Sequence, residues 1–88
     1  MPSWNVYLVR CADGTLYTGI ATDVTRRVAE HNGSDALGAR YTRSRRPVVL
    51  VYAETVATRS EALKREHQIR RLGRAGKEKL MGEEARRS

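Results

Sequence analysis

The sequence predicts an α+β fold in which a three-stranded antiparallel sheet is flanked by helices. Three short runs rich in β-branched and aromatic residues have the composition of strands, and two longer segments repeat apolar residues at helical spacing. These elements follow the order strand, strand, helix, strand, helix. Because the first run carries apolar side chains on both of its faces, helices are expected on both sides of the sheet.

The first two strands form a hairpin, and the length of its loop decides which side chains share a face. A two-residue turn would send Tyr7 and Tyr17 to opposite faces, because side chains alternate along a strand. A loop of three residues, Ala12-Asp13-Gly14, would instead place both tyrosines on one face, with Tyr7 opposite Gly19. The two strands are expected at Trp4–Arg10 and Thr15–Ile20.

The first helix is expected to run from a cap at Asp23 to about Asn32, with Gly33 placed to end it. One face of this helix mixes apolar and cationic or titratable groups. Structural explanations exist for both polar members: Arg27 could extend its stem over apolar neighbours, and His31 could favour the negative end of the helix dipole. The members of this face are Val24, Arg27, Val28 and His31.

Residues 33–47 have no sustained apolar period, and their second half is a basic loop that carries one aromatic residue. A solvated surface is one interpretation of such a loop. Because an aromatic ring is interleaved with several guanidinium groups, contact with nucleic acid is favoured. The residues concerned are Arg40, Tyr41, Arg43, Arg45 and Arg46.

The second half of the chain predicts one strand and one long helix. Val48–Val56 is expected to form a central strand. Thr58 and Glu61 form a capping box for a helix over Arg59–Leu72. A short last helix is expected near Lys77–Met81.

Glu66 lies on the apolar stripe of this long helix, beside Ala62, Ile69 and Leu72 or Gly73. A carboxylate in such a stripe needs a cation or a donor to offset its lost hydration. A bound metal ion and a salt bridge to Arg27 satisfy that need equally well, so the spacing leaves both open.

The composition bounds the class of protein. With 88 residues the chain is expected to form one domain over residues 1–88, and a net charge of +7 favours a polyanionic partner, with nucleic acid ahead of a membrane surface. The single cysteine, Cys11, argues against a disulfide scaffold or a zinc finger and fits a cytoplasmic setting. Neither a membrane span nor a signal peptide is expected.

Taken together, the ordered residues resemble the GIY-YIG nuclease domain, and in particular its small stand-alone members. Asn5-Val6-Tyr7 stands at the Gly-Ile-Tyr position, and Tyr17-Thr18-Gly19 stands at the Tyr-Ile-Gly position about ten residues later. Arg27 and His31 fall at the helix positions of that family, and Glu66 falls in its glutamate pattern. The basic segment and the strand after it also resemble the stand-alone members.

This resemblance implies a metal-dependent endonuclease that hydrolyses DNA phosphodiester bonds, in DNA repair or processing. Glu66 would hold Mg²⁺ or Mn²⁺, and Arg27 would clamp the scissile phosphate. Tyr7 would act as the general base, with Tyr17 and His31 orienting the water or the phosphate. These five residues are expected to converge on one open face.

The sequence departs from the family pattern at Asn5, Val6, Thr18 and Gly76, and Gly76 disfavours the last helix. No targeting module is visible, so the DNA substrate, branched or single-stranded DNA included, stays open, as does a partner protein that directs cleavage. The alternative function is a basic module that binds DNA or RNA on the same fold without cleaving it.

Overall fold

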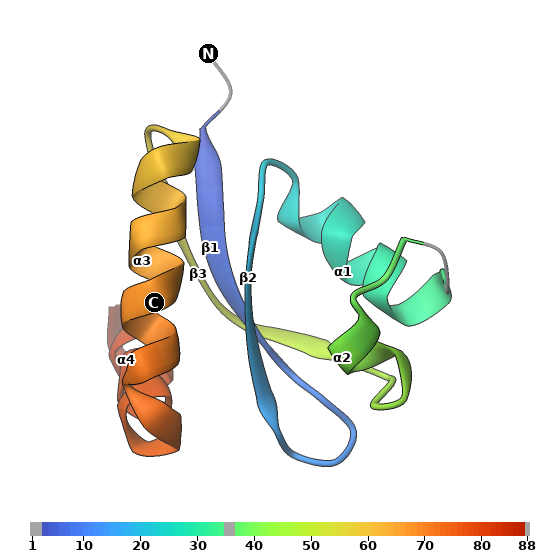
Figure 1. The fold of residues 1–88 in the computed structure, drawn as a ribbon. Coiled ribbons are helices and arrows are strands. Elements are labelled where there is room, and N and C mark those ends of the chain that lie inside the picture. Colours follow the sequence, from blue (N-terminus) through green and yellow to red (C-terminus); the bar gives the residue numbers. More distant parts are fainter. Residues whose placement is uncertain (1–2, 35–36, 88) are drawn as a thin grey trace.

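A computed structural model of the chain describes residues 3–34 and 37–87, with side chains as far as Gly82. Three antiparallel strands form one sheet in the order β2-β1-β3. Helices α1 and α2 cover one face of the sheet, and α3 and α4 cover the other (Figure 1). The elements are β1 (Trp4–Arg10), β2 (Leu16–Ala21), α1 (Val24–Gly33), α2 (Arg40–Arg43), β3 (Val49–Val56), α3 (Arg59–Arg71) and α4 (Gly73–Arg87). The predicted α+β fold is confirmed.

The hairpin between β1 and β2 closes through the three-residue loop. The Cys11 amide donates to the Thr15 carbonyl at 2.8 Å, and Gly14 takes φ 87°, a left-handed conformation that favours glycine. In the resulting register Tyr7 lies opposite Gly19, and Tyr17 lies opposite Val9. The expectation that both tyrosines share a face in this register is therefore confirmed.

The two predicted helix caps are also present. The Asp23 carboxylate accepts from the Arg26 amide at 3.0 Å, and the Thr58 hydroxyl accepts from the Glu61 amide at 3.1 Å. Each bond satisfies one of the amides that a helix leaves unpaired in its first turn. Local chemistry alone explains where both helices begin.

Three expectations about the later elements are wrong. β3 is an edge strand, because β1 pairs with both of its neighbours and so occupies the centre. Part of the basic loop forms the single helical turn α2. The last helix is far longer than Lys77–Met81, because Leu80 and Met81 pack under the sheet and stabilise α4 despite its glycines.

Gly76 has a packing role in this arrangement. A Cβ at Gly76 would lie 2.6 Å from Leu72 Cβ, so the missing side chain lets the start of α4 approach the end of α3. Gly73, with φ 71°, makes the turn between the two helices. The low helix propensity of glycine is therefore outweighed by tertiary contacts.

Asn5, which departs from the family pattern, joins all three strands. Its Nδ2 donates to the carbonyls of Ala21 and Thr22 at 3.3 Å, and its Oδ1 accepts from Thr55 Oγ1 at 2.9 Å. The substitution therefore strengthens the end of the sheet and leaves the neighbouring Tyr7 in place.

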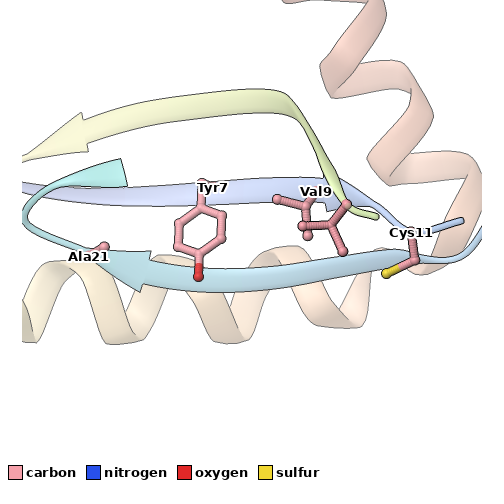
Figure 2. Packing of buried hydrophobic residues seen from close by; sticks show 5 residues of the cluster. Tyr7, Val9, Cys11 and Ala21 are labelled. Carbon is pink, nitrogen blue, oxygen red and sulfur yellow. The ribbon is translucent and has the colours of Figure 1, made fainter. Parts of the chain in front are cut away.

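The sheet separates two hydrophobic clusters. On the α1 side, Tyr7 and Val9 pack with Cys11, Ala21 and Val48 (Figure 2). On the other side, Val6 and Leu8 pack with Ala62 and Ile69 of α3. Consecutive residues of the central strand thus supply both cores, as expected for a strand that is apolar on both faces. Among the described residues, no helix is long and apolar enough to cross a membrane.

Candidate active site

The hydroxyl of Tyr7 is the centre of the site. Its ring leaves the central strand β1 and reaches across to the edge strand β2, as Figure 2 shows. A Cβ on Gly19 would lie against the hydroxyl oxygen, Cζ and Cε1 of Tyr7. Glycine at this position therefore makes room for the phenol, and this contact gives the triplet Tyr17-Thr18-Gly19 a physical reason.

A chain of hydrogen bonds runs from this hydroxyl into the protein. The Tyr7 hydroxyl lies 2.8 Å from His31 Nε2, and His31 Nδ1 lies 2.9 Å from the hydroxyl oxygen of Thr42. The Ala39 amide lies 3.4 Å from the same Nδ1. His31 and Thr42 are fully buried and Tyr7 is 1% exposed. The polar groups of this chain satisfy one another away from water.

Tyr17 contacts the same histidine from the neighbouring strand. Its ring meets the His31 ring edge to face, with the centroids 5.6 Å apart, and stacks on Tyr41 at 5.5 Å. The Arg45 guanidinium lies 4.1 Å from the centroid of the Tyr41 ring. The aromatic groups thus form a continuous series from the buried histidine to half-exposed Tyr41.

Arg27 is partly exposed and already engaged. Its guanidinium contacts the Glu30 carboxylate at 3.1 Å and donates to the Leu37 carbonyl. Burial acts against the charge, but the bond to Glu30 and the nearby Tyr7 hydroxyl outweigh it, so the pKa of Arg27 is raised. A permanently charged fork therefore lies beside the phenol.

Glu66 lies on α3, which packs against β1 and β2. Its ion pair is with Arg70 at 3.7 Å, whereas Arg27 pairs with Glu30. The salt bridge between Glu66 and Arg27 considered from the sequence is therefore not the arrangement in this structure. The Glu66 side chain is 21% exposed, so it is not enclosed in an apolar stripe.

Burial and neighbouring charges set the protonation states. Burial raises the pKa of Tyr7 to about 12; Arg27 opposes this shift, and Tyr17 and Glu66 add to it. Burial and the positive charge of Arg27 lower the pKa of His31, so its ring is neutral at pH 7. All four neighbours named in the sequence analysis therefore act on the Tyr7 hydroxyl through contact or charge.

The expectation that the five residues share one open face is wrong for the two that are buried, and Glu66 comes from α3, which covers the face of the sheet opposite the Tyr7 cluster. Tyr7 and His31 are buried, and only Tyr17, Arg27 and Glu66 are partly exposed. The centre of the cluster is covered in this structure, because hydrogen bonds hold the inner pair under the aromatic residues.

The structure divides the basic segment into two groups. Arg40 and Arg43 are exposed on α2, and Tyr41 is 39% exposed. Arg45 contacts the Asp13 carboxylate of the hairpin loop at 3.1 Å and donates to the Tyr41 carbonyl at 2.8 Å. Arg46 is half-buried. Arg40 and Arg43 are thus the cations most accessible to a phosphate backbone, while Arg45 joins two loops.

A hard divalent cation fits this donor set only in part. Among the side chains that the structure describes, in residues 3–34 and 37–82, no group of three or more histidine, cysteine, aspartate or glutamate side chains could hold a metal ion. The partly exposed carboxylate of Glu66 suits Mg²⁺, which keeps several waters and binds through one or two carboxylates plus substrate phosphate. Such a site would be completed by the substrate.

The chain belongs to the family of the GIY-YIG catalytic domain, a nuclease family, whose model matches residues 3–80. Among curated relatives, a UPF0213 protein of Desulfotalea psychrophila is 62% identical over 91% of this chain and 72% of its own length. Another UPF0213 protein, from Halobacterium salinarum, is 55% identical over 86% of this chain and 96% of its own length.

Two solution NMR structures resemble the fold. A UPF0213 protein of Bacillus halodurans is 39% identical with a TM-score of 0.57, over 91% of this chain and 83% of that one. A protein of E. faecalis is 38% identical with a TM-score of 0.63, over 93% and 85%. The likeness supports both the family and the α+β fold.

Sequence reasoning missed Thr42. It stood among the arginines of the basic segment and looked like a polar loop residue. The one available signal was its place between Tyr41 and Arg43: in a single helical turn, neighbouring residues point to different sides.

Proposed function

We propose that this protein is a metal-dependent endonuclease that hydrolyses DNA phosphodiester bonds. One observation carries the proposal: a phenol from β2, an imidazole and a guanidinium from α1, and a carboxylate from α3 all act on the Tyr7 hydroxyl. A merely structural tyrosine needs one hydrogen-bond partner, and His31 already supplies it. Arg27 and Glu66 add opposite charges that packing does not require.

In this proposal Tyr7 is the general base. As a phenolate it takes a proton from a water whose oxygen attacks phosphorus; the new P–O bond forms while the bond to the leaving oxygen breaks, and that oxygen takes up a proton from solvent. Because the pKa of Tyr7 is raised to about 12, only a small fraction of it is phenolate at pH 7. A divalent cation held at Glu66 would increase that fraction, because a nearby positive charge favours the phenolate.

Arg27 is the phosphate clamp. Its guanidinium is held by a partly exposed carboxylate and by a backbone carbonyl, so a phosphate can exchange for these partners in a bidentate contact. Glu66 would hold Mg²⁺ or Mn²⁺, which would neutralise charge on the phosphoryl and leaving oxygens. Arg40, Tyr41, Arg43, Arg45 and Arg46 form the proposed DNA-contacting segment, and Arg40 and Arg43 are its most exposed cations.

The test is a cleavage assay with purified protein on supercoiled plasmid, branched DNA and single-stranded DNA, with Mg²⁺ and with chelator. The expected result is cleavage of at least one DNA only when Mg²⁺ is present. Binding without cleavage of any of them would instead support the non-catalytic binding module. Cleavage in chelator would contradict the role of the metal.

A further inference from the structure

The one-turn helix α2 carries Thr42, whose hydroxyl contacts Nδ1 of His31, while Tyr7 contacts Nε2 of the same ring. Thr42 is fully buried, although it lies in the most basic segment of the chain. Its neighbours Arg40 and Arg43 are exposed on the same turn, and Tyr41 stacks on Tyr17. α2 therefore has an outer side with cations and an inner side that contacts the aromatic cluster.

The hydrogen bonds around Thr42 decide which nitrogen of His31 carries the proton. The Ala39 amide is a donor that cannot turn around, and it is directed at Nδ1. The Ala39 carbonyl already accepts from the amides of Thr42 and Arg43, both at 3.1 Å. The Thr42 hydroxyl oxygen also lies 3.0 Å from that carbonyl oxygen. Because the two amides already use both lone pairs of the carbonyl, the hydroxyl is better satisfied by donating to Nδ1 at 2.9 Å.

We propose that Thr42 is a positioning residue that holds neutral His31 with its proton on Nε2, so that the ring donates a hydrogen bond to the Tyr7 oxygen. This inference rests on the proposed function, because the bond matters for catalysis only if Tyr7 is the base. A donor at 2.8 Å stabilises the phenolate over the phenol. A proton on Nδ1 would make His31 an acceptor, and the phenol would then be favoured.

Another buried threonine shows that burial alone does not produce this arrangement. Thr18 is 3% exposed on β2 and lies opposite Leu8, on the face covered by α3. Its hydroxyl has no hydrogen-bond partner among the described residues. Thr18 and Thr42 thus form a matched pair. Thr18→Val removes a hydroxyl that has no partner among the described residues, whereas Thr42→Val removes the hydroxyl that contacts His31.

The test compares Thr42→Val, Thr42→Ser and Thr18→Val. Nitrogen-15 NMR of the histidine rings reports the tautomer of His31 without any need for cleavage. The parent is expected to show a protonated Nε2 and an unprotonated Nδ1. Thr42→Val should shift these signals toward a mixture of tautomers, while Thr42→Ser and Thr18→Val should keep the signals of the parent.

Cleavage gives the second readout. Thr42→Val should cut DNA at least about tenfold more slowly, the factor that corresponds to one hydrogen bond of ordinary strength, and Thr42→Ser should restore most of the rate. A parent with its proton on Nδ1, or a Thr42→Val variant with unchanged histidine signals, overturns the proposal. If the parent cuts no DNA while the signals behave as expected, the proposed function fails and the tautomer assignment stands.

Discussion

Replacing Gly19 with alanine tests the packing that brings the Tyr7 hydroxyl to His31. The added methyl group would meet the hydroxyl oxygen, Cζ and Cε1 of Tyr7, all within 2.9 Å of a Cβ at this position. The φ angle of Gly19 is not in the left-handed region, so space alone resists the substitution. Because Tyr7 is 1% exposed and bonded to His31, its ring has no free direction in which to move.

The expected cost combines two effects. Overpacking a core costs about 1–3 kcal/mol. Breaking the 2.8 Å bond between two buried groups adds on the order of 1 kcal/mol. We therefore expect Gly19→Ala to lower the free energy of unfolding by about 2–4 kcal/mol, which lowers the melting temperature by at least about 8 °C in a domain of this size.

Urea denaturation measures this cost, and NMR of the His31 ring reports the lost bond. Gly33→Ala is the matched control, because a Cβ at that position has nothing within 4 Å. Its stability should stay within about 1 kcal/mol of the parent. A Gly19→Ala protein as stable as the parent, with unchanged His31 signals, would refute the packing argument.

Three further variants test charged or titratable groups. Arg43→Ala should weaken DNA binding and reduce its salt dependence by about 0.9 in log K per log salt without changing stability, since Arg43 is exposed. Arg45→Ala should lower the melting temperature as well, because it removes the contacts with Asp13 and Tyr41. If Arg43→Ala and Arg45→Ala changed the melting temperature equally, the structural role of Arg45 would be contradicted. The raised pKa of Tyr7 means that folding favours the neutral phenol, so its contribution to stability is full below about pH 10 and is lost as the pH rises to about 12. Tyr7→Phe should therefore lose less stability than the parent between pH 10 and 12, and parallel pH profiles would show that Tyr7 is not the shifted group.

Much of the fold could be predicted because its signals are local. Gly14 determines the hairpin loop, and Asp23 and Thr58 mark helix starts through bonds to amides three residues away. The register of the hairpin then places Tyr7 and Tyr17 on one face without any knowledge of the rest of the chain.

The features that could not be predicted depend on distant contacts. Whether β3 is central or an edge strand depends on which strand pairs with both neighbours, which the composition of β3 does not reveal. The length of α4 depends on Leu80 and Met81 finding the core, and the role of Thr42 depends on α2 folding back over His31. The burial of the Tyr7 hydroxyl follows from the same packing.

Glu66 is the proposed metal ligand of this nuclease. The most direct measurement is single-turnover DNA cleavage by Glu66→Gln over a range of Mg²⁺ concentrations, together with DNA binding and thermal melting. The matched control is Glu78→Gln, because Glu78 also pairs with an arginine one helical turn away, at 2.8 Å from Arg74. Both pairs are partly exposed, so neither substitution should cost more than about 1 kcal/mol of stability. We expect Glu66→Gln to melt and bind DNA as the parent does but to be unable to cut it, while Glu78→Gln should still cut. A Glu66→Gln protein that cleaves DNA at the rate of the parent would contradict this expectation.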